Sequence, residues 1–300
     1  MKLFAMSTVL NTGLNYLLIF GKCGLPALGI QGAAVATLLA RITEFAVCSF
    51  CAVRSRLLPI QWRAFFRPGW EMLQRFVKYS SPVILNETAW GLGNSMLTVI
   101  LGYTDNSVEM LAANAVMGNL NRLFLVVCFG LGAATAVIIG KSIGEGRSHQ
   151  EVMDLSRTLL VFTALVGAGL TVLSLLLVPT LFVPVVFPLF KLYGESAAIA
   201  TALAVTGFLS IPLHAYSISA VTGVLRAGGD VFWSTLLDVG PQWCMALPLT
   251  ALLALVLKAD YWWIAAAIQS ESLLKVPLCA LRIRTGQWIH DVTVRKERGQ

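Results

Sequence analysis

The sequence predicts an all-α fold, a polytopic membrane bundle of about eight transmembrane helices. Of its 300 residues, 57% are hydrophobic and only 12% are charged, whereas about a quarter of the residues in a soluble domain are charged. Apolar runs of about 20 residues, long enough to cross the hydrocarbon core, recur along the chain. The basic residues lie between these runs, so the net charge of +7 indicates orientation in a membrane rather than nucleic-acid binding.

Eight spans are expected in chain order, at 3–20, 31–53, 79–102, 111–139, 158–179, 197–224, 232–256 and 261–281. The first does not resemble a signal peptide, because Asn11 and Asn15 interrupt its apolar core and no cleavage site follows. Of the 22 Lys and Arg residues, 16 lie on one side of these spans, 3 lie on the other side, and the rest lie inside spans. The positive-inside rule then predicts a multi-pass protein of the bacterial plasma membrane with both termini in the cytoplasm.

The longest and most basic connection divides the chain. Residues 1–55 hold two spans, 56–78 form a cytoplasmic linker, 79–284 hold six spans, and 285–300 form a cytoplasmic tail. Residues 7–15 (STVLNTGLN) match residues 234–242 (STLLDVGPQ), and Glu44 matches Glu271 at the same offset, which indicates an internal repeat. The first two spans would then end one repeat and the other six would form a second, an architecture typical of secondary transporters.

Glu87, near the start of the third span, is the leading functional candidate. A carboxylate inside a bilayer costs at least a few kcal/mol, so it needs a partner, a proton or a water-filled cavity. Asn86 lies beside it, and positions 87, 90 and 94 share a helical face, so Trp90 and Asn94 point the same way. One carboxylate with amide oxygens can hold Na⁺ or a proton, and an aromatic wall can pack an organic cation. Pro82 predicts an irregular backbone there; a helix-packing carboxylate bonded to Arg or Lys is the alternative.

Three further residues are candidates for the wall of the same cavity. Asp238 precedes Pro241, and a proline inside a span frees a carbonyl that a cavity tolerates; a structural kink is the alternative. Arg122 has no acidic neighbour on its own span, so Glu87 on the preceding span is its most attractive partner. That pair would compete with a cation at Glu87, and the sequence does not decide between the two. Tyr216 is the third candidate.

Other polar residues inside spans are expected to be structural. Arg41 and Glu44 lie three residues apart and Glu271 and Lys275 four apart, so each pair can neutralise itself within one helix. A lone histidine in an apolar run, such as His214, is more often a core residue with satisfied hydrogen bonds than a ligand.

Neither a metal site, apart from Na⁺ at Glu87, nor an enzyme is expected. Cys48 and Cys51 form a lone C-x-x-C with no second pair and no nearby histidine, so we expect buried, reduced thiols. A membrane enzyme such as a prenyl-group transferase would need paired acidic motifs or a histidine cluster at the interface. Neither occurs in the sequence.

Four motifs resemble the multidrug and toxic compound extrusion (MATE) transporters: residues 14–21 (LNYLLIFG), 29–37 (GIQGAAVAT), 82–90 (PVILNETAW) and 223–230 (GVLRAGGD). The resemblance covers nearly the whole chain. It implies two six-helix lobes around a central cavity, and export of drugs or organic cations in exchange for Na⁺ or H⁺, the coupling ion being the one cofactor. It also makes Glu87 the cation-binding carboxylate of the second lobe.

The chain departs from the family pattern in two ways. Family members have twelve spans, so this chain is expected to begin at the fifth, the missing helices being supplied by a longer reading frame. Many members carry an aspartate in the span matching 197–224, where this sequence has no acid, which leaves a one-carboxylate site at Glu87. Two alternatives remain: a lipid-linked oligosaccharide flippase of the same superfamily, which would need several cavity cations, and a remnant without transport activity.

Overall fold

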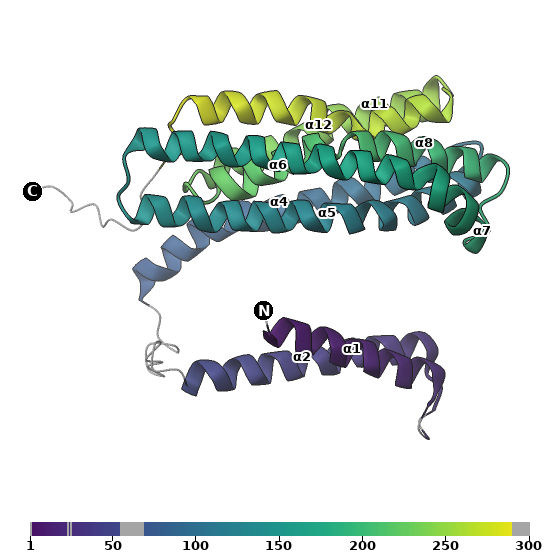
Figure 1. Cartoon of the computed structure of the whole chain (residues 1–300), viewed down its shortest axis with the longest axis horizontal. Helices are drawn as coiled ribbons and strands as arrows, with labels where there is room; N and C mark the ends of the chain where they lie inside the picture. Colours follow the sequence, from purple (N-terminus) through teal and green to yellow (C-terminus); the bar gives the residue numbers. More distant parts are fainter. Residues whose placement is uncertain (1, 23, 25, 55–68, 290–300) are drawn as a thin grey trace, which may run out of the picture. The chain divides into compact units, whose positions relative to one another are not determined.

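The described part of the chain is helical, which confirms the predicted all-α bundle (Figure 1). A computed structural model describes residues 2–22, 24, 26–54 and 69–289, and these contain no strand. The chain forms two compact units, Met1–Gln74 and Arg75–Gln300. The boundary falls within the linker predicted at 56–78. Residues 55–68, which include much of that linker, and the tail from residue 290 onward lie outside the described residues.

The first unit holds a hairpin of two helices, α1 (Lys2–Phe20) and α2 (Gly29–Arg54). The Ser7 hydroxyl donates to Glu44 Oε2 across the hairpin at 2.9 Å. The same oxygen pairs with Arg41 Nη1 at 2.6 Å, so the predicted i, i+3 pair is confirmed. Cys48 and Cys51 are free but exposed. Our expectation of buried thiols was wrong, because a two-helix unit has too little interior to bury the outer faces of its helices.

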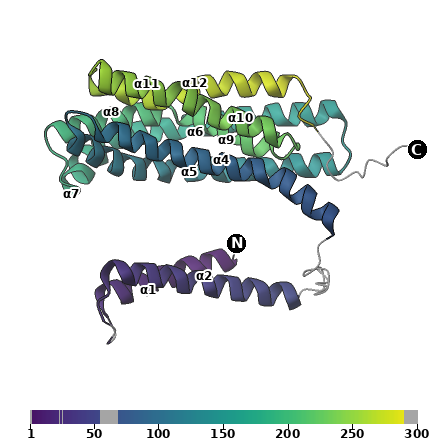
Figure 2. The same ribbon diagram turned by 180° about the vertical axis from the view of Figure 1, so that it is seen from behind.

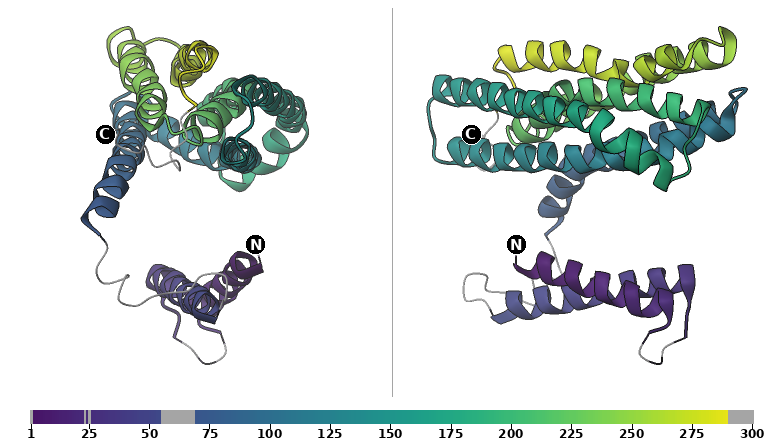
Figure 3. Two further views of the ribbon diagram at one scale, coloured as in Figure 1. Left: turned by 90° about the vertical axis from the view of Figure 1, so that its left-hand side faces the viewer. Right: turned by 45° about the vertical axis from the view of Figure 1, so that its right-hand side comes forward.

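The second unit holds the remaining helical segments, which run from α4 to α12. Ser148 and Glu151 form a reciprocal capping box that fixes the start of α6 beside α5 (Figures 1 and 3), satisfying backbone donors that a helix start leaves free. In chain order the segments are α4 (Trp70–Gly102), α5 (Ser107–Gly144), α6 (His149–Leu177), η1 (Val178–Val186), α7 (Phe187–Leu189), α8 (Glu195–Leu209), α9 (Ile211–Ile218), η2 (Ser219–Leu225), α10 (Val231–Pro241), η3 (Gln242–Ala246), α11 (Leu247–Ala251), η4 (Leu252–Val256) and α12 (Tyr261–Arg284).

Each of the eight predicted spans coincides with a helix or a run of joined helices. By length and composition, five of the described helices can cross a membrane, and six if the bent pair Glu195–Leu209 and Ile211–Leu225 counts as one span. The helices α1 and α4 are not among them. In α4 the polar residues around Glu87 lower the hydropathy of the span, which is the feature that made it a functional candidate.

Two spans of the second unit depart from a regular α-helix near their middle. The pair containing α8 and α9 bends by 47° at Pro212, and α9 passes into the π-helix η2. The helix α10 likewise passes into the π-helix η3 directly after Pro241. Single-turn π segments are frequent at functional sites. By contrast, α4 is helical throughout, so the irregular backbone expected around Pro82 is not present.

Two hydrophobic clusters hold the second unit together, with the polar site between them. On α12, Ile264 and Ala265 belong to the first cluster, and Cys279 and Ile283 to the second. Between these two groups, Ile268, Gln269, Glu271 and Lys275 of α12 line a cavity. The helix α12 lies against α10 (Figure 2), where Leu237 belongs to the second cluster and Asp238 lines the cavity.

Candidate ion and substrate cavity

A cavity of about 790 Å³ lies within the second unit, a size typical of small-molecule sites. Its apolar wall includes Trp90, Leu97, Leu111, Leu125 and Phe129. Its polar wall gathers residues from seven segments: Asn86, Glu87 and Asn94 of α4, Asn114, Asn119, Asn121 and Arg122 of α5, His214 and Ser217 of α9, Thr222 of η2 with Arg226 just after it, Asp238 of α10, Gln242 of η3, and Gln269, Glu271 and Lys275 of α12.

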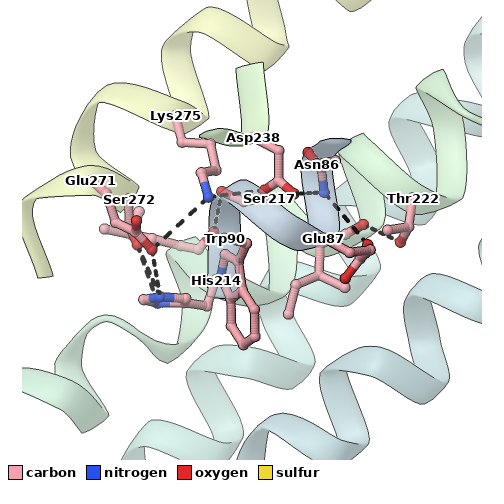
Figure 4. Close-up of polar contacts among 12 residues, drawn as sticks. Asn86, Glu87, Trp90, His214, Ser217, Thr222, Asp238, Glu271, Ser272 and Lys275 are labelled. Atoms are coloured by element: carbon pink, nitrogen blue, oxygen red, sulfur yellow. Dashed lines mark hydrogen bonds and ion pairs between the residues drawn. The ribbon is translucent and has the colours of Figure 1, made fainter. Parts of the chain in front are cut away.

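Hydrogen bonds to α10 and η3 position the α4 side of the cavity. The Thr235 hydroxyl donates to the Pro82 carbonyl at 3.2 Å, and Trp243 Nε1 donates to the Ala89 carbonyl at 3.1 Å. Between them, Asn86 Nδ2 donates to Asp238 Oδ2 at 3.0 Å. Asn86 is therefore 1% exposed, and the neighbouring Glu87 points into the cavity (Figure 4).

The Glu87 carboxylate lines the cavity with one loosely held cation beside it. Arg226 Nη1 lies 3.5 Å from Glu87 Oε1, while 63% of the Glu87 side chain is exposed. Arg122 lines the cavity too, but it forms no ion pair among the described residues. The suggested Arg122–Glu87 pair is therefore wrong. The partner is Arg226, which lies just beyond the span predicted at 197–224.

Asp238 is held far more tightly than Glu87. Its Oδ1 accepts from Lys275 Nζ at 3.0 Å, and its Oδ2 accepts from Asn86 and lies 3.8 Å from Arg226 Nη2. Lys275 is 5% exposed. A buried charge needs such a partner, because its desolvation costs several kcal/mol. The Arg226 guanidinium thus lies between Glu87 and Asp238.

A third carboxylate extends the network along α12 (Figure 4). Glu271 Oε1 lies 3.9 Å from Lys275 Nζ and 3.7 Å from His214 Nε2. The predicted pair within α12 is present, but Lys275 lies closer to Asp238 than to Glu271. His214 lines the cavity instead of lying in the apolar core.

The other predicted residues divide between the cavity and the core. Trp90 and Asn94 both line the cavity, and the Asn94 amide donates back to the Trp90 carbonyl at 3.0 Å. Tyr216 is not among the lining residues; it packs against the second hydrophobic cluster. The reason is helical geometry, because His214 and Ser217 face the cavity and a residue between them points elsewhere.

Sequence reasoning missed His214, Arg226, Glu271 and Lys275 as cavity residues. The available signal was that Asp238 lacks a basic partner on its own helix, so it needed a cation from another element. Glu271 and Lys275 were set aside because a pair four residues apart can neutralise itself. That argument did not consider a third charge from another helix.

The described residues offer no cluster of ligands for a transition metal, but they do offer oxygen atoms for a single Na⁺ ion. Among them, no group of three or more His, Cys, Asp or Glu side chains is placed to hold a metal. Asn86 Oδ1, beside Glu87, is a buried oxygen without a hydrogen-bond partner in this part of the chain. Oxygen donors of this kind suit a hard cation such as Na⁺.

No family model matches the chain, but curated proteins do. The chain is 25% identical over 258 residues to "Probable multidrug resistance protein YoeA" of Bacillus subtilis, covering 83% of this chain and 52% of that protein. It is 30% identical over 172 residues to a "Probable multidrug resistance protein NorM" of Mannheimia succiniciproducens, covering 54% and 35%. The chain therefore spans about half the length of the curated relatives it matches.

Solved structures agree on the fold. The eukaryotic MATE transporter AtDTX14 superposes with a TM-score of 0.76 at 18% identity, over 96% of this chain and 62% of that one. A MATE transporter in complex with MaL6 gives 0.75 at 18% identity, over 94% and 63%. The resemblance stated from the motifs is confirmed in fold and sequence. These relatives are transporters and not enzymes, and the chain is a multi-pass membrane protein.

Proposed function

We propose that this chain, which has the MATE fold, belongs to a secondary antiporter that exports organic cations in exchange for Na⁺ or H⁺. Glu87 binds the coupling ion, and the aromatic and amide wall beside it binds the substrate. The protein would lie in a bacterial plasma membrane with both termini in the cytoplasm. The exchange draws on an ion gradient, so it requires no nucleotide.

The observation that carries this proposal is the contrast among the three cavity carboxylates. The Asp238 and Glu271 side chains are 21% and 15% exposed and both face the buried Lys275. Glu87 is 63% exposed and has one cation at 3.5 Å. A carboxylate exchanges ions readily where it is itself solvated and its fixed partner is not in close contact, because the Coulomb attraction is then weak. Glu87 meets that condition, and the other two do not.

Arg226 can transmit ion binding at Glu87 to the rest of the cavity, because it contacts both Glu87 and Asp238. Its two terminal nitrogens face Glu87 and Asp238 at 3.5 Å and 3.8 Å. An ion bound at Glu87 takes over the neutralising role of the guanidinium, which then pairs with Asp238 alone. Since Arg226 follows η2 and Asp238 lies just before η3, this shift acts directly on the two spans that contain these π-helical segments. The outward-open state would be favoured in this way.

The cavity wall fits an organic cation. Trp90 and Phe129 offer aromatic faces, to which a cation binds with about 0.5–2 kcal/mol. Asn94 and Asn119 add amide groups without net charge. A bulky cation placed here would contact both walls while remaining near the open Glu87 carboxylate.

Glu87→Gln tests the proposal in cells that carry the chain. Ethidium export driven by an ion gradient should fall to the level of cells without the protein, because the amide cannot exchange an ion. Glu145→Gln is the matched control, since Glu145 pairs with Arg147 in an exposed turn outside the cavity. Export by Glu87→Gln at the level of Glu145→Gln would contradict the assignment.

A lipid-linked oligosaccharide flippase is the second candidate, favoured by one observation. Three cations line the cavity, Arg122, Arg226 and Lys275, and Arg122 is unpaired among the described residues. An unpaired guanidinium suits a phosphate group. Arg122→Gln distinguishes the two functions: it should leave ethidium export intact or improved under our proposal, whereas a flippase would lose movement of its anionic lipid.

A further inference from the structure

His214 and Glu271 form an acid–base pair that the proposed role of Glu87 does not use. The His214 Nε2 atom lies 3.7 Å from Glu271 Oε1, and the two side chains are 20% and 15% exposed. They come from α9 and α12, and both line the cavity (Figure 4). Imidazole is the side chain whose charge ordinarily changes between about pH 5 and 8.

The surrounding hydrogen bonds determine which nitrogen is free to take a proton. His214 Nδ1 lies 3.1 Å from the Ser210 carbonyl, an acceptor, so we assign the resident proton to Nδ1. Nε2 is then the basic nitrogen, and it faces Glu271. The Ser272 hydroxyl lies 3.2 Å and 3.3 Å from the two ring nitrogens and adds a neutral dipole. A proton arriving at Nε2 thus forms a charged pair with Glu271.

The charges that face this pair come from every neighbouring element with a side chain in the cavity. Lys275 on α12 lies 3.9 Å from Glu271 but is held by Asp238 of α10 at 3.0 Å. Arg226 after η2 and Arg122 on α5 lie on the same wall. The helix α6 also packs on α9, but none of its described residues lines the cavity.

The formal charges of the lining balance when His214 is neutral. Three carboxylates and three permanent cations line the cavity, so a proton on His214 leaves it with one net positive charge. A positive cavity repels an organic cation, and a bound organic cation opposes protonation of the imidazole. The two binding events are therefore linked with opposite sign, and linkage of this kind is reciprocal.

We propose that His214 and Glu271 form a proton-binding pair, separate from Glu87, whose proton competes with an organic cation for the cavity. The proton-binding half of this inference stands on the geometry alone. The competition rests on the proposed function, because it requires the cavity to bind organic cations. If the competition exists, H⁺ is exchanged for the organic cation at this pair, whichever ion binds to Glu87.

Nuclear magnetic resonance of ¹⁵N-histidine tests the pair in the full chain in detergent. The chain has 3 histidines, and His214→Gln identifies the His214 signals. At about pH 6.5, where free imidazole is half protonated, the imidazolium fraction of His214 should be lower in Glu271→Gln than in wild type. Glu145→Gln, which removes a charge in an exposed turn outside the cavity, should match wild type. An equal fraction in Glu271→Gln and wild type would overturn the pair.

Glu271→Asp takes the place of Glu271→Gln if the latter does not fold. This variant keeps the negative charge, but its side chain is one methylene shorter, so the carboxylate lies farther from His214. The imidazolium fraction of His214 should therefore be below that of wild type. A fraction equal to wild type would again overturn the pair. The neutral form at high pH should show the proton on Nδ1; a proton on Nε2 would contradict the assigned geometry.

Proton release on binding tetraphenylphosphonium tests the competition. In weakly buffered solution at the same pH, wild type should release protons when the cation binds. His214→Gln should release fewer, by the imidazolium fraction measured above. Equal release from the two proteins overturns the competition. Failure of wild type to bind the cation contradicts the proposed function, and the histidine spectra then still decide whether the proton-binding pair exists.

Discussion

At the scale of single residues, Lys275 neutralises the buried side of the cavity. It is 5% exposed and reaches Asp238 at 3.0 Å and Glu271 at 3.9 Å. Two carboxylates share this ammonium, and among the described residues the one other lysine or arginine paired with either is Arg226, 3.8 Å from Asp238. The network is therefore asymmetric: losing the one cation leaves two partly buried anions, whereas losing one anion leaves the cation paired.

Lys275→Met should destabilise the protein by about 3 kcal/mol, the usual cost of leaving a buried charge without its partner. Asp238→Asn in addition should recover at least about 1 kcal/mol, because the two residues interact directly. Denaturant titration in detergent measures both free energies of unfolding. Strict additivity of the two single changes would contradict the ion pair.

The sequence predicted part of this site and missed the rest for a physical reason. Glu87, Trp90 and Asn94 were predictable because helical periodicity places them on one face of α4. Lys275 was not, because its spacing from Glu271 offered a complete local explanation for its charge. Charges that pair across helices leave no trace in the spacing along either one.

At the scale of elements, close contact between helices holds the bent span of α8 and α9 in place. A Cβ built on Gly167 of α6 would lie 2.8 Å from Pro212 Cα and 3.0 Å from Ala215 Cβ on α9. Two residues on, a Cβ on Gly169 would meet nothing within 4 Å. The two glycines therefore offer a matched comparison on one helix, with equal gain in helix propensity and different packing.

Gly167→Ala should lower the free energy of unfolding by about 1–3 kcal/mol, because the new methyl group meets backbone that must move. Gly169→Ala should leave it unchanged or raise it by up to about 1 kcal/mol, the helix propensity difference between the residues. Denaturant titration of both variants under one condition provides the check. The opposite order of stabilities would contradict the packing of α6 on α9.

The sequence also indicated where elements pack, but not where they break. Small residues within a span let helices pack closely, and Gly167 does so against α9. Proline alone did not predict irregular backbone: α4 continues through Pro82, whereas α10 passes into a π-helix after Pro241. Both prolines stand within a few residues of polar side chains that line the cavity, so neither the proline nor its polar neighbours decide where a span changes its helix type.

At the scale of the whole molecule, three loops of the second unit meet at one end. Lys258 pairs with Asp105 at 2.9 Å, and Asn106 donates to Glu195. These contacts join the α4–α5, α7–α8 and η4–α12 connections. Two of the three basic residues that the sequence placed on the sparse side of the membrane, Lys191 and Lys258, lie in these connections. The grouping of loops agrees with the predicted spans, while their side of the membrane stays a prediction.

Reporter fusions test that side directly. Green fluorescent protein joined after Arg147 should fluoresce, and alkaline phosphatase joined after Lys191 or Lys258 should be active, because those positions are predicted to be cytoplasmic and external respectively. Inactive phosphatase at both external positions would reverse the assigned orientation. Activity at only one of them would show that a span between the two was assigned wrongly.

The central claim is that a coupling ion and an organic cation exchange in one cavity through Glu87. Equilibrium binding of tetraphenylphosphonium to the purified chain, measured while Na⁺ concentration and pH are varied, tests it most directly. The account predicts that binding weakens as Na⁺ or H⁺ rises, and that the part of this response due to Glu87 is absent in Glu87→Gln. An affinity of wild type for tetraphenylphosphonium that changes with neither Na⁺ concentration nor pH would contradict the account.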